Sequence, residues 1–163
     1  MTELTAPLTF PLATAEAQLA FGENLASLLL PPLCIALTGD LGTGKTTLTR
    51  GILRGLGYAG PVRSPTYTLV ESYVLPTLEL HHFDLYRLGD PDELEYLGLR
   101  DLLGATTIWI IEWPERGSGW LPPPDLRIAL THQGTGRHLT LTALTAVGAT
   151  LLANIVIADD PLF

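Results

Sequence analysis

Residues 39–46 read Gly39-Asp40-Leu41-Gly42-Thr43-Gly44-Lys45-Thr46, which fits the GxxxxGK[ST] pattern of a phosphate-binding loop. The apolar run at residues 33–37 is typical of a short buried strand, and residues 46–53 have the pattern of the first turns of a helix. Strand, glycine loop and helix follow one another in the order that the motif requires. The sequence therefore predicts a nucleotide-binding protein.

The chemistry of the loop positions supports this prediction. Gly42 and Gly44 allow backbone conformations that point successive N–H groups inward, where the N-terminus of the following helix adds positive charge. Lys45 is the single lysine of the chain and is placed to reach the terminal phosphates, while the Thr46 hydroxyl is placed to bind Mg²⁺. The residues expected to contact the nucleotide are Leu41, Gly42, Thr43, Gly44, Lys45, Thr46 and Thr47.

Length and composition limit the class of protein. The chain has 163 residues, 47% of them hydrophobic, which fits a single domain over residues 1–163. Its formal net charge of −8 argues against a free-standing nucleic-acid binder, because neutralising many phosphates needs an excess of Lys and Arg. Cys34 is the single cysteine, so no disulfide can form within one chain. With no signal peptide or membrane-spanning stretch, we expect a cytoplasmic protein without membrane association.

Strand and helix patterns on both sides of the loop predict an α/β fold. We expect a helix from Thr14, as N-cap, to about Leu30, and it should pack in front of the loop strand. The elements expected later in the chain are a hairpin of residues 67–75 and 78–85, a helix of 90–104, strands of 106–111, 126–131 and 138–144, and an apolar helix of 146–156. Together they predict a P-loop NTPase-like three-layer sandwich with a mixed central sheet and flanking helices.

Two acidic residues lie where a nucleotide-bound metal could use them. Glu112 directly follows the predicted strand of residues 106–111, as a Walker-B-type acid would, and Asp84 ends another β run. Either alone could be a solvated acid, but two such acids beside a complete loop favour a catalytic or metal-binding role. The segment Ser64-Pro65-Thr66-Tyr67-Thr68 has the hydroxyl groups of a mobile switch that senses the γ-phosphate.

Two adjacent histidines are weaker candidates for metal binding. His81 and His82 lie on a predicted strand, so their side chains face opposite sides of the sheet. They therefore cannot bind one ion together.

Four segments together resemble the bacterial TsaE (YjeE) family of ATPases, which takes part in making threonylcarbamoyladenosine in tRNA. They are residues 39–47, residues 64–71 (Ser-Pro-Thr-Tyr-Thr-Leu-Val-Glu), residues 82–88 (His-Phe-Asp-Leu-Tyr-Arg-Leu) and residues 111–115 (Ile-Glu-Trp-Pro-Glu). Their order and spacing match the family, and the last three are more specific than the loop. The chain departs from the family at Thr43, where alanine is common, and at residues 158–163, which extend beyond the usual end.

The resemblance implies an ATP- and Mg²⁺-dependent ATPase that works with two partner proteins, TsaB and the carbamoyltransferase TsaD. By this analogy, ATP hydrolysis supports turnover of the partner complex, and tRNA is contacted only through the partners. Thr46 and Glu112 would bind Mg²⁺, and Asp84 would be needed for hydrolysis, either by activating water or by organising the metal. Arg137 resembles a family arginine that lies near the nucleotide.

Other nucleotide-binding classes remain as alternatives. A GTPase of the common type would need an Asn-Lys-x-Asp segment, which a chain with a single lysine cannot contain outside the loop. A small-molecule P-loop kinase shares the loop but needs an arginine-bearing lid, whereas the arginines here are scattered. A nucleotide-gated binding protein with negligible hydrolysis would use ATP only to order residues 64–68.

Overall fold

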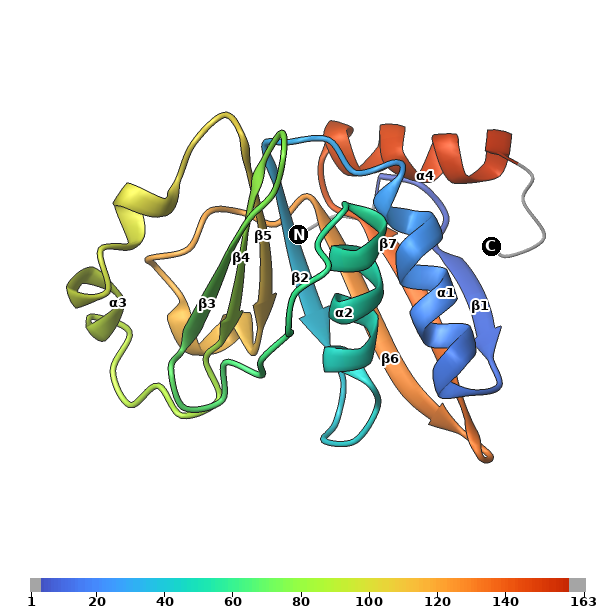
Figure 1. Cartoon of the computed structure of the whole chain (residues 1–163), viewed down its shortest axis with the longest axis horizontal. Coiled ribbons are helices and arrows are strands. Elements are labelled where there is room, and N and C mark those ends of the chain that lie inside the picture. The colour runs from blue at the N-terminus through green and yellow to red at the C-terminus, as the bar shows by residue number, and fades with distance from the viewer. Residues whose placement is uncertain (1–3, 159–163) are drawn as a thin grey trace.

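In the computed structural model, which describes residues 4–158, seven strands form one mixed sheet in the order β1-β7-β6-β2-β5-β4-β3 (Figure 1). The strands are β1 (Leu8–Leu12), β2 (Leu33–Thr38), β3 (Val70–Val74), β4 (Glu79–Asp84), β5 (Thr107–Glu112), β6 (Leu126–Gln133) and β7 (Gly136–Ala143). The central strand β2 pairs in parallel with β5 and β6, and β5 pairs in parallel with β4. The β1–β7, β6–β7 and β3–β4 pairs are antiparallel.

Helices α1 (Ala15–Ala26) and α2 (Lys45–Gly55) lie side by side over one face of the sheet (Figure 1). Their apolar side chains, among them Phe21 and Ile52, form a core with Ile35, Ile110 and Ile128 of the sheet. The other face, over β4 and β5, is covered by α3 (Glu93–Tyr96), 3₁₀ turns at Leu99–Leu102 and Pro114–Gly117, and their loops. Helix α4 (Ala146–Ala158) packs against β7. The predicted three-layer arrangement is confirmed.

The parallel strands position the site. Successive residues of β2 and β5 are buried on both faces, as expected for strands covered on both sides. Because β4 and β5 run in the same direction, Asp84 and Glu112 are register partners at their carboxyl ends. The β2–α2 loop leaves the sheet at this same edge. Sequence-distant polar residues are thereby brought to the first turn of α2.

Two predicted helices differ from expectation. The Thr14 side chain accepts a hydrogen bond from the Ala17 N–H and begins α1 as predicted, but α1 ends at Ala26 instead of about Leu30. The backbone N–H groups of residues 27–29 donate instead to the carbonyls three residues earlier. These tight turns end the helix just before Pro31 and Pro32. The helix predicted over residues 90–104 is interrupted at Gly98, which has a left-handed backbone (φ 66°), and becomes two short pieces.

The predicted strands form, with shifted ends, and one further strand is present. The hairpin is confirmed as β3 and β4. Strand β1 is this additional strand, and its Pro11 is tolerated because β1 is an edge strand, where a missing N–H can face away from the ladder. Among residues 4–158, no helix is long and apolar enough to cross a membrane.

Candidate nucleotide site

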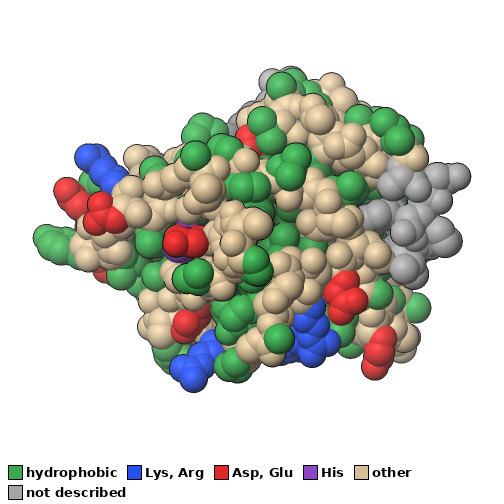
Figure 2. Space-filling model, turned by 45° about the horizontal axis from the view of Figure 1, so that its top comes forward, with side chains coloured by type: hydrophobic (Ala, Val, Ile, Leu, Met, Phe, Trp, Pro, Cys, Tyr) green, Lys and Arg blue, Asp and Glu red, His purple; other side chains and the backbone are tan. Residues whose placement is uncertain are grey.

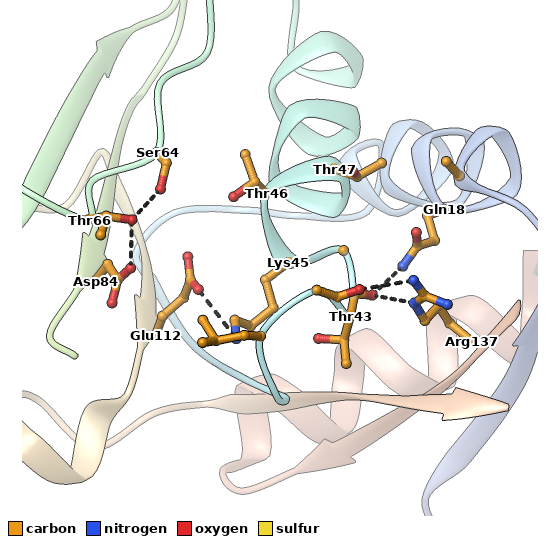
Figure 3. A pocket seen from close by; sticks show the side chains of 14 residues that line it. Gln18, Thr43, Lys45, Thr46, Thr47, Ser64, Thr66, Asp84, Glu112 and Arg137 are labelled. Atoms are coloured by element: carbon orange, nitrogen blue, oxygen red, sulfur yellow. Dashed lines mark hydrogen bonds and ion pairs between the residues drawn. The ribbon is translucent and has the colours of Figure 1, made fainter. Parts of the chain in front are cut away.

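A pocket of about 410 Å³ opens at the carboxyl edge of the parallel strands, in front of the first turn of α2 (Figure 3). This volume falls within the range of small-molecule sites. All of the predicted loop contacts, residues 41–47, line the pocket. The other lining residues are Ala15, Gln18, Ser64, Thr66, Asp84, Glu112 and Arg137. The structure therefore brings together the loop, both predicted acids and the predicted arginine.

The loop has the backbone conformation that an anion nest needs. Gly42 and Gly44 have φ values of 79° and 94°, in the left-handed region that favours glycine. The Thr43 N–H and hydroxyl both donate to the Asp40 carbonyl, which closes the loop on itself. Helix α2 begins at Lys45, so the N–H groups of its first turn face the pocket. This arrangement suits a phosphate group.

Lys45 is held at the base of the pocket. Its ammonium group donates to the backbone carbonyls of Gly39 and Asp40, and its Nζ lies 3.8 Å from Glu112 Oε1. The Trp113 ring lies beneath the same nitrogen, 5.5 Å from Nζ to the ring centroid. These contacts hold the lysine ammonium beside the Glu112 carboxylate.

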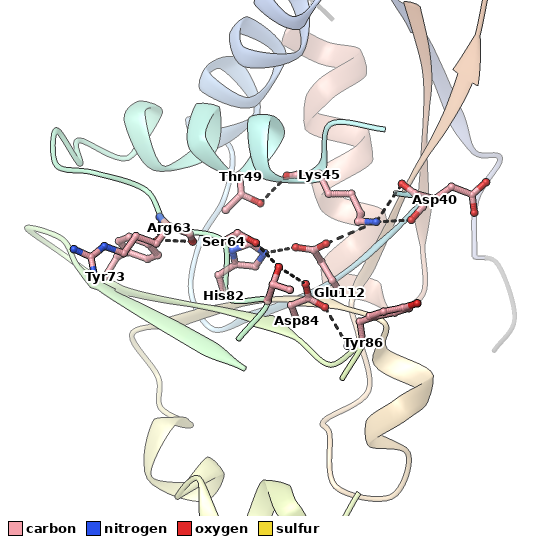
Figure 4. Close-up of polar contacts among 12 residues, drawn as sticks. Asp40, Lys45, Thr49, Arg63, Ser64, Tyr73, His82, Asp84, Tyr86 and Glu112 are labelled. Atoms are coloured by element: carbon pink, nitrogen blue, oxygen red, sulfur yellow. Dashed lines mark hydrogen bonds and ion pairs between the residues drawn. The ribbon is translucent and has the colours of Figure 1, made fainter. Parts of the chain in front are cut away.

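The two acids differ in their partners. Asp84 Oδ1 accepts from the Tyr86 N–H at 3.0 Å, and Oδ2 lies 3.4 Å from the Thr66 hydroxyl (Figure 4). Glu112 instead contacts Lys45 and the ring of His82. Asp84 is therefore linked to the predicted switch segment, and Glu112 to the loop.

Only part of the predicted switch segment lines the pocket. Ser64 and Thr66 do so, and their hydroxyl oxygens lie 2.7 Å apart. Pro65 is buried and does not line the pocket, and its carbonyl accepts from the Leu69 N–H. Tyr67 is 82% exposed and also lies outside the pocket lining, with the Arg87 guanidinium stacked 4.6 Å from its ring centroid.

Two side chains brace the loop from other elements. Gln18 of α1 donates its amide N–H to the Thr43 carbonyl at 2.8 Å. Arg137 of β7 donates to the same carbonyl from Nε and to the Gly42 carbonyl from an Nη, at 3.2 and 2.9 Å (Figure 3). Sequence reasoning missed Gln18. The sequence feature that could have identified it is its position on the same buried helix face as Gly22 and Leu25, where a polar side chain needs a hydrogen-bond partner.

The histidines lie on opposite faces, as predicted. His82 contacts Glu112 on the α2 face, a role that sequence reasoning missed. His81 contacts the Ser72 hydroxyl through Nδ1 on the other face, and burial lowers its pKa, although Glu79 acts in the opposite sense. Burial, reinforced by Asp125, raises the pKa of the Cys34 thiol to about 12.

The donor set tests which metal the site could hold. Within the part of the chain that the structure describes, no three His, Cys, Asp or Glu side chains gather as a metal cluster. The pocket offers instead oxygen donors from Thr46, Asp84 and Glu112. This set fits Mg²⁺, which keeps several waters and binds through one or two carboxylates plus substrate phosphates, and it does not fit a preformed protein cage.

Comparisons with known proteins agree with this geometry. The family model described as threonylcarbamoyl adenosine biosynthesis protein TsaE matches residues 12–139, a range that contains every residue lining the pocket. The tRNA threonylcarbamoyladenosine biosynthesis protein TsaE of Haemophilus influenzae is 44% identical over 142 residues, covering 84% of this chain and 90% of that protein. The protein of the same name from Bacillus subtilis is 36% identical over 126 residues, covering 77% and 78%. A crystal structure of Bacillus subtilis YdiB has a TM-score of 0.79 at 28% identity, covering 98% of this chain and all of that one.

Proposed function

Because the chain belongs to the TsaE family of tRNA threonylcarbamoyladenosine biosynthesis, we propose that it binds ATP with Mg²⁺ and hydrolyses it in support of this tRNA modification. The observation that carries the proposal is that the loop, Lys45 and two strand-end carboxylates line the same pocket. A loop of this kind without nearby carboxylates would support phosphate binding alone.

The proposal assigns roles to the pocket residues. The backbone of residues 41–47 would bind the phosphates, and Lys45 would bring its charge to the terminal ones. Thr46 and Glu112 would hold Mg²⁺, which when bound would offset the negative charge of the phosphates. Gln18 and Arg137 would keep the loop carbonyls turned away from the anion, since both donate to those carbonyls.

Hydrolysis would need a group that positions water. Asp84 is buried at its strand end, lines the pocket and has its Oδ2 near the Thr66 hydroxyl. A carboxylate there can accept a proton from water or hold a water that belongs to the metal. Thr66 would connect this carboxylate to the switch segment, so that the nucleotide state could alter residues 64–68.

The proposal includes partner proteins of the TsaB and TsaD type, with tRNA contacted through them and not by this chain alone, and it places the protein in the cytoplasm. The net charge of −8 supports this division of labour. On the face shown in Figure 2, the Lys and Arg side chains of the described residues form small separate groups among apolar and acidic ones, with no broad basic surface.

Reconstitution tests the proposal. We expect the purified chain to bind ATP more tightly with Mg²⁺ than with EDTA, to release phosphate weakly alone, and to support tRNA modification by TsaB and TsaD over many turnovers. Lys45→Ala should lose ATP affinity and its support of tRNA modification while remaining folded, because Lys45 lines the pocket and is not part of the apolar core. Arg54→Ala, at an exposed position of α2, is the matched control. Transfer of the phosphate to a small acceptor would favour a kinase instead.

A further inference from the structure

His82 contacts the Glu112 carboxylate (Figure 4), and of the two only Glu112 lines the pocket. Its Nε2 lies 2.7 Å from Glu112 Oε2, whereas Oε1 of the same carboxylate lies 3.8 Å from Lys45 Nζ. We propose that His82 is a positioning residue that fixes the Glu112 carboxylate for the Mg²⁺ of bound ATP. This inference rests on the function proposed above.

The sheet register places the histidine at this carboxylate. His82 is two residues before Asp84 on β4, so both side chains face α2. Since Asp84 is opposite Glu112 and His82 is opposite Ile110, the histidine lies two register positions deeper in the sheet than the acid. His82 is fully buried and Glu112 is 4% exposed. The glutamate thus has a buried donor behind it and the pocket in front.

The hydrogen bond has a defined direction. Nδ1 of His82 is buried and has no hydrogen-bond partner among the described residues. A hydrogen on Nε2 fits this environment, because the Glu112 carboxylate lies within hydrogen-bond distance of Nε2 while an N–H at Nδ1 would be buried without an acceptor. Nε2–H therefore donates to Oε2 and holds the carboxylate in place.

Fixing the carboxylate in advance should strengthen metal binding. A free glutamate side chain samples several rotamers, and ordering it costs free energy when the metal binds. Hydrogen bonds from residues behind the ligands of a metal reduce this cost, and their loss typically weakens metal affinity by about 10- to 100-fold.

The neighbouring histidine provides a matched control. His81 is almost as deeply buried, but its ring faces the other side of the sheet and bonds to Ser72. A general loss of stability would follow from replacing either histidine, whereas a change in Mg²⁺ dependence should follow only from replacing His82.

The experiment measures ATP affinity by calorimetry, with Mg²⁺ and with EDTA, and compares their ratio among variants of the full chain. We expect His82→Leu to reduce the Mg²⁺-dependent gain by about 10- to 100-fold while the affinity in EDTA is kept. His82→Gln, whose amide can donate to Glu112, should recover much of the gain, and His81→Leu should leave the ratio unchanged. Should His82→Leu fail to fold, His82→Asn replaces it, because the shorter amide lacks the reach.

The inference would be overturned if the ratio of ATP affinity with Mg²⁺ to ATP affinity with EDTA were the same in the parent and in His82→Leu. It would also be overturned if His81→Leu reduced this ratio as much as His82→Leu does. A parent that gains no ATP affinity from Mg²⁺ would overturn the proposed function itself. In that case a double-mutant cycle of His82→Leu and Glu112→Gln, by urea unfolding without nucleotide, decides the pairing. Additive shifts of the unfolding midpoint would show that the two side chains are not coupled.

Discussion

Asp84 and Glu112 are register partners at the ends of adjacent parallel strands, yet their carboxylates bond to different parts of the molecule. Asp84 connects to the Thr66 hydroxyl, and Glu112 connects to Lys45 and His82. Two acids in equivalent positions of the sheet therefore contact different parts of the pocket, Asp84 the segment of residues 64–68 and Glu112 the lysine of the loop.

This difference predicts distinct effects of neutralising each acid. We expect Glu112→Gln to weaken ATP binding in Mg²⁺ more than in EDTA, because it removes a proposed metal ligand. Asp84→Asn should instead reduce the rate of phosphate release by about 10²- to 10⁴-fold, the usual contribution of a general base, and affect ATP affinity less. Calorimetry and single-turnover assays measure the two effects. Identical behaviour of both variants would contradict the separation of roles.

The brace on the loop predicts an effect that does not depend on metal. Arg137→Ala removes donors to the Thr43 and Gly42 carbonyls, which should cost about 1–3 kcal/mol of ATP binding free energy. The loss should be the same with Mg²⁺ and with EDTA, since the bonds hold the backbone and not the cation. Arg54→Ala serves as the control with unchanged affinity. A loss confined to Mg²⁺ would argue for a different role of Arg137.

Coupling between ATP and the partner proteins is a third prediction. If residues 64–68 report the nucleotide state, ATP with Mg²⁺ should change the affinity of the chain for the TsaB–TsaD complex. By linkage, that complex must then change ATP affinity by the same factor. Titrations in both directions measure the two factors, and Thr66→Val, which lacks the hydroxyl near Asp84, should reduce both. Partner affinity that is independent of nucleotide would contradict the switch.

The environment of His81 predicts a pH dependence of stability. Burial holds the pKa of the folded-state imidazole below its ordinary value of about 6.5, so the unfolded chain binds a proton more readily than the folded one. The contribution of His81 to the free energy of unfolding is therefore fully present above about pH 6.5 and is lost as the pH falls below that value. Urea unfolding between about pH 5 and pH 8 should show a smaller loss in His81→Gln than in the parent. His132→Gln, at an exposed position, should lose as much stability on acidification as the parent does.

Local sequence was a sound guide to the elements around the loop. The strand, loop and first turns of α2 form where the motif placed them, because each depends on residues next to one another in the chain. Strand β1 depended on a distant segment, because a strand that contains Pro11 is tolerated at the sheet edge beside β7. The interruption of the helix predicted over residues 90–104 was a local effect, since Gly98 adopts a left-handed backbone there.

The sequence by itself determined the GxxxxGK[ST] loop, the two strand-end acids and the family, since these are properties of short contiguous motifs. Only the tertiary structure decided which residues support them. Gln18 reaches Thr43 across 25 positions, and His82 reaches Glu112 across 30. These contacts depend on how α1 packs on α2 and on the register of β4 against β5. Neither is encoded in a local pattern, because packing and strand register are fixed only when the whole core forms.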